Sequence, residues 1–413
     1  MTDPDWLAAA LSGARPQAVA ALLRYFRDLD LAEEAFQEAS LRALRNWPEK
    51  GPPRDPASWL IMVGRNVALD KLRRQKRETM LPDEEQLSDL EDAEGAMAAR
   101  LDESDYRDDI LRLMFVCCHP DLPATQQVAL SLRIVSGLSV ATIARAFLVG
   151  DSAMEQRITR AKARIAAGSV PFEAPDAAER AQRLNSVAAM LYLVFNEGYS
   201  TDVASAGARA PLCIEAIRLT RLLLRLFPTE PEIMGLLALM LLQHARAGAR
   251  FDKAGQVVLL EDQDRTLWDA GAITEGLALV DKAMRHRQPG PYQVQAAIAA
   301  LHARARRAED TDWPQIDLLY ATLEKMRPSP VVTLNRSVAV GKVQGPQAAL
   351  DMIEPLEAQL SGYFYFFGAK GAFLLQLDRQ EEAAVAFDRA IALAKTAAEA
   401  ALIRTHLDRF MKR

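Results

Sequence analysis

Apolar residues recur at intervals of three and four along nearly every long segment of this 413-residue chain, and period-two alternation is rare. Such spacing puts side chains on one face of an α-helix, whereas a half-buried strand needs alternation. One example is the run Val140, Ile143, Ala144 and Phe147. We therefore predict an all-α protein.

A chain this long exceeds one ordinary hydrophobic core, so we expect two to three domains. Proline, glycine and charge clusters suggest four segments: a helical bundle over 1–77, an acidic linker over 78–108, a second helical unit over 109–170, and a larger helical region over 171–413. In the first segment we predict helices over 16–26, 31–46 and 57–75. Trp47 and Pro48 are expected to end the second helix, because proline disfavours a helix interior.

The formal net charge of −5 argues against a nonspecific coat on nucleic acid, but the charge is unevenly distributed. Residues 59–77 hold six basic residues and one acid, which suits contact with phosphate. Residues 78–109 hold thirteen acids and two arginines, a balance typical of a solvated, disordered tether.

Three cysteines occur, and two of them, Cys117 and Cys118, are adjacent and precede His119. This number makes a poor disulfide framework, and neighbouring side chains rarely converge on one metal ion. We therefore expect buried thiols, no metal and no cofactor. The longest apolar run, Met234 to Leu242 broken by Gly235, is shorter than the roughly 20 residues that cross a bilayer. The start, MTDPDW, does not resemble a secretion signal, so we expect a cytoplasmic protein without membrane contact.

The most specific motif lies between Gly137 and Lys162. Ser139 is a suitable N-cap for one helix, and Ser152 with Glu155 forms a capping-box pattern that predicts the start of a second. The second helix is predicted to pack through Met154, Ile158, Ala161 and Ile165. It should leave outward Glu155, Gln156, Thr159, Arg160 and Lys162. This pattern favours a DNA-binding helix-turn-helix over a plain helical hairpin.

Two upstream helices carry the second motif, AEEAFQEASLR over 32–42 and WLIMVGRNVALDKLRR over 59–74. In the later helix Leu60, Val63 and Val67 should face a core. The opposite side should present Asn66, Asp70 and Arg73. Such a face can hold a nucleic-acid backbone and reach bases.

These two segments resemble the second region of extracytoplasmic-function sigma factors, and the helix-turn-helix resembles their fourth region. Together the matches cover roughly residues 15–167, in the family's order with an acidic linker between them. The resemblance implies that the partners are promoter DNA and the RNA polymerase core with its beta and beta-prime subunits.

The resemblance also implies roles for individual residues. The polymerase core would be contacted by Glu33, Glu34, Gln37 and Glu38. The minus-ten promoter element would be engaged by Trp59, Arg65, Asn66, Asp70, Lys71, Arg73 and Arg74, and the proline-rich loop before Trp59 would capture a flipped base. The minus-thirty-five element would be read by Ser152, Gln156, Arg157, Thr159, Arg160 and Lys162. The acidic linker would run toward the RNA exit path.

The chain departs from the family's usual residues at Leu31, at Gly64 and in the opening of the recognition helix, so the promoter sequence cannot be read. Residues 117–120 and 146–149 point to a subgroup with a tetratricopeptide-like extension. A 34-residue offset relates Ala349 to Ala383, as expected for that repeat. The same offset relates Ser337 to Gly371, Val340 to Leu374, and Ile353 to Phe387. A further hairpin is predicted from 292–306 with 313–326.

Two polar, aromatic segments of the extension form a candidate regulatory pocket for a protein or small molecule. Its residues are Asn196, Glu197, Tyr199, Asp264, Arg265 and Trp268, with Asp264 and Arg265 available as a charge pair and Trp268 as a wall. The alternative is that these groups cap helices and fix packing. We expect the extension to replace a separate anti-sigma protein by holding or releasing the DNA-binding units.

Two other functions stay open on sequence alone: a helix-turn-helix regulator that acts without polymerase, and a tetratricopeptide-like adaptor that binds proteins. An enzyme is the least favoured class, because no catalytic motif stands out and we predict no catalytic residue.

Overall fold

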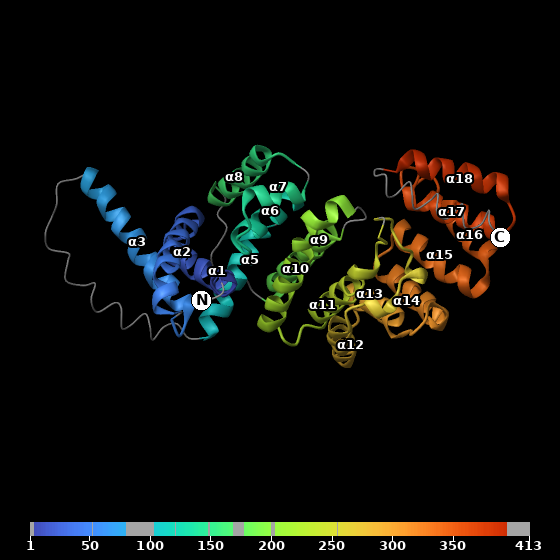
Figure 1. The fold of residues 1–413 in the computed structure, drawn as a ribbon, viewed down its shortest axis with the longest axis horizontal. Coiled ribbons are helices and arrows are strands. Elements are labelled where there is room, and N and C mark those ends of the chain that lie inside the picture. The colour runs from blue at the N-terminus through green and yellow to red at the C-terminus, as the bar shows by residue number, and fades with distance from the viewer. Residues whose placement is uncertain are drawn as a thin grey trace. The chain divides into compact units, whose positions relative to one another are not determined.

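The computed structural model describes residues 4–51, 53–79, 103–119, 121–147, 149–167, 177–199, 203–253 and 255–394. Within these ranges the regular elements are helices, together with an isolated bridge between Phe251 and Val257 (Figure 1). The predicted all-α class is confirmed. The chain divides into two compact units, Met1–Val194 and Phe195–Arg413, which are described separately.

The first unit begins with three helices that pack on one another: α1 (Pro4–Phe26), α2 (Leu29–Lys50) and α3 (Pro56–Thr79). The prediction that Trp47 and Pro48 end the second helix is wrong, because α2 continues to Lys50 with Pro48 inside it. Pro48 has no N–H to donate to the Leu44 carbonyl, so α2 keeps this proline at the loss of one helical hydrogen bond and ends two residues later. The helix ends instead at Gly51, whose φ of 78° suits glycine and whose N–H donates to the Trp47 carbonyl at 2.8 Å.

Gly64 lets α3 approach α2 closely. A Cβ at this position would lie 2.9 Å from the Ala35 carbonyl oxygen and 3.2 Å from a methyl carbon of Leu22. The glycine that departs from the family pattern therefore lies where two helix backbones meet, and the close approach offsets its low helix propensity.

The described part of the first unit continues with α5 (Glu103–Cys117), α6 (Ala124–Ile134), α7 (Val140–Ala146) and α8 (Asp151–Ala167). Helix α5 packs against α1 and begins inside the range predicted as linker, and residues 80–102 of that linker lie outside the described residues. Cys117 and Cys118 are buried, as predicted, and burial raises the pKa of the Cys118 thiol to about 12 despite a hydrogen bond with Ser131.

The first compact unit ends at Val194 and the second begins at Phe195, both within α9 (Ala177–Gly198). The predicted start of the extension at residue 171 stays a prediction. The amino-terminal part of α9 belongs to the first unit, where the Arg183 guanidinium lies 5.7 Å from the centre of the Phe115 ring.

In the second unit α11 (Pro231–His244) is the central helix and packs against α10 (Val203–Leu226), α12 (Ala270–Arg285) and α13 (Pro291–Arg304). Its residues from Ile233 to Leu242 are all buried, which accounts for the long apolar run. None of the described helices is long and apolar enough to cross a membrane.

The second unit continues with α14 (Trp313–Met326) and two helical pairs, α15 (Pro330–Gln344) with α16 (Pro346–Ile353) and α17 (Phe364–Gln376) with α18 (Gln380–Leu393). Helix α17 begins 34 residues after α15, and α18 begins 34 residues after α16. Gly371 packs against the buried Phe387 ring, where a Cβ would lie 2.7 Å from a ring carbon. The two copies of the predicted repeat are thus two helical pairs, and their assignment to the tetratricopeptide class stays a prediction.

Candidate functional site

Helices α7 and α8 pack against each other as a helix-turn-helix. The Ser139 side chain accepts a hydrogen bond from the Thr142 N–H at 3.1 Å, so it caps α7 as predicted. Helix α8 begins at Asp151, so Ser152 lies in its first turn and not at the predicted N-cap. The four predicted packing residues of α8, Met154, Ile158, Ala161 and Ile165, are all buried.

The outward face of α8 presents most of the residues predicted to read DNA. Ser152, Gln156, Thr159 and Arg160 are exposed, Arg157 is half-buried, and Arg160 donates to the Gln156 side chain at 3.3 Å. Lys162 is the exception, because its side chain is only 18 % exposed and its ammonium contacts two carboxylates of α2. The prediction that Lys162 points outward is therefore wrong for this arrangement of the chain.

The four residues of α2 predicted to bind the polymerase core separate into two groups. Gln37 and Glu34 are exposed, and Glu34 pairs with Lys71 of α3 at 2.5 Å. Glu38 is half-exposed and lies 3.7 Å from Arg42. Glu33 is buried, with 4 % of the residue exposed. Three of the four side chains are thus available at the surface.

Three cations from other helices surround the Glu33 carboxylate. The ammonium of Lys162 and a guanidinium nitrogen of Arg133 each lie 2.9 Å from it, and a guanidinium nitrogen of Arg15 lies 3.4 Å away. Lys162 also pairs with Asp30 at 2.6 Å. Removing one partner of such a buried ion pair costs about 3–5 kcal/mol, so Glu33 fixes α2 against α6 and α8.

Arg15 adds two neutral contacts to this cluster. Its Nε donates to the Ile134 carbonyl at 2.9 Å, and its guanidinium lies 4.8 Å from the centre of the Phe36 ring. Gly137, with a φ of 74°, leaves room for it, because a Cβ there would lie 2.6 Å from the Arg15 side chain. The cluster combines ion pairs, backbone hydrogen bonds and ring packing.

Burial and charge act in opposite directions on the two basic groups. Burial disfavours the charged form of Lys162, but hydrogen bonds and charges from Asp30 and Glu33 outweigh it and raise the pKa of Lys162. For Arg15 burial is the larger effect, and together with the nearby charge of Arg133 it lowers the pKa of the guanidinium against the opposing effect of Glu33. Lys162 is therefore a cation held by its two acidic partners.

Helix α3 carries the polar face that the sequence predicts. Asp70 and Arg73 are exposed and lie 4.0 Å apart, and Asn66 is half-buried one turn before Asp70. Arg65 is buried, with its guanidinium 5.8 Å from the centre of the Tyr25 ring. It is thus not presented at the surface with the others.

Two further residues predicted to contact the minus-ten element complete α3. The Trp59 ring packs edge-on against Trp47, with 5.3 Å between the ring centres, which anchors the start of α3 on the end of α2. The Arg74 side chain lies outside the described part of the structure.

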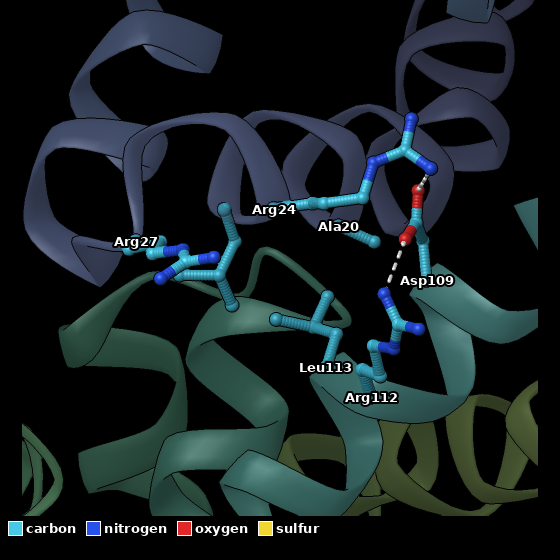
Figure 2. Close-up of a pocket in the computed structure, with 7 residues that line it drawn as sticks. Ala20, Arg24, Arg27, Asp109, Arg112 and Leu113 are labelled. Carbon is cyan, nitrogen blue, oxygen red and sulfur yellow. Dashed lines mark ion pairs between the residues drawn. The ribbon is translucent and has the colours of Figure 1, made fainter. Parts of the chain in front are cut away.

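A second ionic contact joins α1 to α5 beside a pocket lined by Ala20, Leu23, Arg24, Arg27, Asp109, Arg112 and Leu113. Figure 2 shows the Asp109 carboxylate between two guanidinium groups, 3.3 Å from Arg24 of α1 and 3.7 Å from Arg112 of its own helix. Asp109 is almost fully buried, so this pair also ties the first three helices to the helix-turn-helix module.

The structure brings together some of the residues of the candidate regulatory pocket. Arg246 links them, because it donates to the Tyr199 hydroxyl at 3.2 Å and lies close enough to Arg265 to lower the pKa of that guanidinium, which burial lowers most. Trp268 is buried under Arg265, and Asn196 is exposed. The expected pair of Asp264 with Arg265 does not form in the described contacts, because Asp264 accepts from Thr266.

Sequence reasoning missed several residues of these clusters: Arg15, Asp30, Asp109, Arg133 and Arg246. Arg15 left a weak signal, since it lies among apolar residues on the α1 face that carries Val19 and Leu22. Among the residues that the structure describes, no three His, Cys, Asp or Glu side chains lie close enough to hold a metal ion.

Three family models match the chain. Residues 13–78 match sigma-70 region 2, residues 112–165 match sigma-70 region 4, and residues 183–284 match a family of unknown function, DUF6596. An uncharacterized protein of Rhizobium meliloti (strain 1021) is 69 % identical over 408 residues, which cover 99 % of this chain and 96 % of that protein. No solved structure matches the chain.

Proposed function

Because the chain belongs to the sigma-70 family, as a sigma factor of the extracytoplasmic-function type with a C-terminal helical extension, we propose that it directs RNA polymerase core to specific promoters and assists DNA opening. Regions 2 and 4 support polymerase core and promoter DNA as the partners. Sigma factors in general are not enzymes, and we assign no catalytic residue.

The exposed face of α8 is the observation that carries the proposal. Its buried residues fix the helix on α6 and α7, so Gln156, Thr159 and Arg160 are held on a rigid element facing outward. Arginine can donate two hydrogen bonds to guanine, and glutamine can donate one to adenine N7 while accepting one from the adenine amino group. These side chains suit a helix that reads the minus-thirty-five element in the major groove.

Region 2 supplies two further binding surfaces in the proposal, one for the polymerase core and one for the minus-ten element. We assign polymerase contact to Glu34, Gln37 and Glu38 of α2, and minus-ten contact to Asn66, Asp70 and Arg73 of α3. None of the six is buried. We assign opening of the DNA to α3, because its sequence carries a run of basic residues toward the end of the helix.

The contact between Glu33 and Lys162 gives the free protein a closed form. It joins the helix assigned to polymerase docking to the helix assigned to DNA recognition, and it occupies one residue of each. Polymerase core and promoter DNA would compete for these two charges and separate the modules. The closed form thus lowers DNA binding before the polymerase is engaged.

We assign a regulatory role to the extension. Removing residues 199–413 should change promoter-dependent transcription by reconstituted polymerase, because it removes nearly all of a large unit that packs separately from the sigma modules. Unchanged output and unchanged regulation would remove this part of the proposal.

The promoter-reading role is tested by two matched variants of α8. Arg160→Ala should weaken binding of the holoenzyme to the upstream element by about 1–3 kcal/mol, as expected for loss of a base contact. Arg164→Ala removes the same charge from the same helix, but Arg164 is bonded to the Asp121 carbonyl at 3.2 Å and should have little effect. Tight, specific binding to duplex DNA without core polymerase would favour an independent regulator instead.

A further inference from the structure

Three arginines of the second unit lie in the segment between α11 and α12. Arg246 follows α11 directly, Arg250 follows the short helix η2 (Ala247–Ala249), and Arg265 begins the short helix η4 (Arg265–Leu267). Within the part of the chain that the structure describes, no carboxylate lies at ion-pair distance from these three guanidinium groups. Other arginines of the same unit differ: carboxylate oxygens lie 2.6 Å from Arg221 and 2.7 Å from Arg336.

Aromatic rings hold two of the three arginines in place. The Arg250 guanidinium lies 3.7 Å from the centre of the Tyr199 ring, and Arg246 donates to the hydroxyl of the same tyrosine at 3.2 Å. The Arg265 guanidinium lies 4.6 Å from the centre of the Trp268 ring. Stacking on a ring leaves the N–H edge of a guanidinium available to donate.

Backbone contacts join these two halves into one patch. The Asp269 N–H donates to the Ala245 carbonyl at 2.9 Å, which sets the segment after η4 beside the end of α11, and η2 packs against η4. Arg265 also donates to the carbonyls of His302 and Ala305, at 2.5 Å and 2.7 Å. The patch of Tyr199, Arg246, Arg250, Arg265, Trp268 and His302 is therefore built by four separate parts of the chain.

The nearby carboxylates are bonded to other groups. Asp264 accepts from Thr266, Asp269 accepts from the Ala272 N–H at the start of α12, and Asp310 pairs with Arg307 at 2.9 Å. The positive charge of the patch is thus incompletely balanced by the protein.

The patch also contains an unsatisfied donor. The Trp268 indole N–H is buried and has no hydrogen-bond partner among the described residues, although the residue is only 7 % exposed. A buried donor without an acceptor is destabilising, so such a group calls for an explanation.

The electrostatics agree with this geometry. Burial, and then the neighbouring charge of Arg246, lowers the pKa of both Arg250 and Arg265, although nearby tyrosine, cysteine and carboxylate groups act in the opposite direction. Burial, together with the charges of Arg246 and Arg265, lowers the pKa of His302 to about 4, so the imidazole is neutral at pH 7. Arg246 thus repels both Arg250 and Arg265, and the nearby acidic groups offset this repulsion only in part.

We propose that this patch binds a small phosphorylated molecule through its phosphoryl group. A phosphoryl group carries about 1.5 to 2 negative charges near pH 7 and offers three acceptor oxygens, which suits several guanidinium edges better than the single charge of one carboxylate. This inference goes beyond the proposed function and does not depend on it, because binding can be measured without polymerase or DNA.

The test is calorimetric titration of the full chain with inorganic phosphate and with tripolyphosphate, at constant ionic strength, and with acetate as the carboxylate probe. We expect saturable binding of both phosphates and none of acetate. Arg246→Gln and Arg250→Gln should each weaken binding at least about tenfold. The control Arg327→Gln removes an exposed arginine elsewhere in the same unit and should bind as the natural chain does.

Tyr199→Phe is a second test of the proposal, and it changes the packing of the patch less than the arginine substitutions do. It keeps the ring beneath Arg250 and removes only the hydroxyl that accepts from Arg246, so binding should weaken by less than in Arg246→Gln. Equal phosphate binding by all variants, or no saturable binding of either phosphate, would overturn the proposal. Displacement of phosphate by duplex DNA would also overturn it, because the patch would then be a nucleic-acid contact.

Discussion

At Gly235 a single methyl group has no room. A Cβ there would lie 2.6 Å from the backbone nitrogen of Gln293 on the neighbouring helix α13. We expect Gly235→Ala to lower the free energy of unfolding by about 1–3 kcal/mol, because one of the two helices must move. Gly362→Ala is the control, since nothing lies within 4 Å of its added Cβ. Thermal melting of both variants is the measurement, and equal midpoints would contradict the packing described.

Individual charged residues were the hardest part to predict. The burial of Glu33 depends on Arg15, Arg133 and Lys162, which come from distant parts of the sequence, and no local pattern pairs residues 129 positions apart. The sequence predicts that Lys162 points outward, because it lies on the polar side of α8. In the structure, α2 covers its side chain. Residue-level sequence reasoning therefore identified the helix face correctly and missed what covers it.

The contact of α2 with α8 predicts a graded response to mutation. Asp30→Asn should favour the open form by less than about 1 kcal/mol, because Asp30 is 74 % exposed and exposed pairs contribute little. Lys162→Gln should have a larger effect, because it also removes a partner of the buried Glu33 carboxylate.

Energy transfer between dyes on α2 and α8 measures this opening. Cysteines introduced at the exposed positions Arg45 and Ala166 can be labelled selectively, because the three natural cysteines are buried. Arg164→Gln changes the same helix without touching the contact and is the control. The closed form would be rejected if Lys162→Gln and Arg164→Gln gave the same transfer efficiency as the natural chain.

His302, in the last turn of α13, predicts a pH effect on the second unit. Burial and two neighbouring arginines lower the pKa of His302 from 6.5 to about 4, so the unfolded chain binds this proton more readily than the folded one. Stability that is present above pH 6.5 should thus decline as the pH falls toward 4. At pH 5 the loss should be about 2 kcal/mol.

Melting of His302→Asn beside the natural chain between pH 7.5 and 5 isolates this effect. The variant should lose less stability on acidification, because carboxylates titrate equally in both proteins. Parallel melting curves over that range would show that the imidazole is accessible to protons in the folded state.

Elements were easier to predict than single residues. The buried face of α8 follows from spacing within one helix, so Met154, Ile158, Ala161 and Ile165 could be named from sequence. Helix ends were harder to place, because Pro48 stays inside α2 and Ser152 lies one residue inside α8. Both errors arise where a favourable local signal competes with continued helical hydrogen bonding.

At the scale of the whole molecule, the chain combines sigma regions 2 and 4 with a helical extension that packs as its own unit. The order of the modules was predictable because each carries a compact motif. The unit boundary inside α9 was not, since a continuous helix gives no sequence signal of where its contacts change. The regulatory role that we propose for the extension depends on what it contacts, and its sequence does not specify those contacts.

The most direct test of the central proposal is association of the purified chain with RNA polymerase core at modest ionic strength, followed by sequencing of transcript starts. We predict tight association and defined start sites, weakened by Glu34→Lys on the exposed face of α2. Glu49→Lys, a matched charge reversal on the same helix, should leave both unchanged. Failure of the natural chain to associate with core polymerase would contradict the assignment.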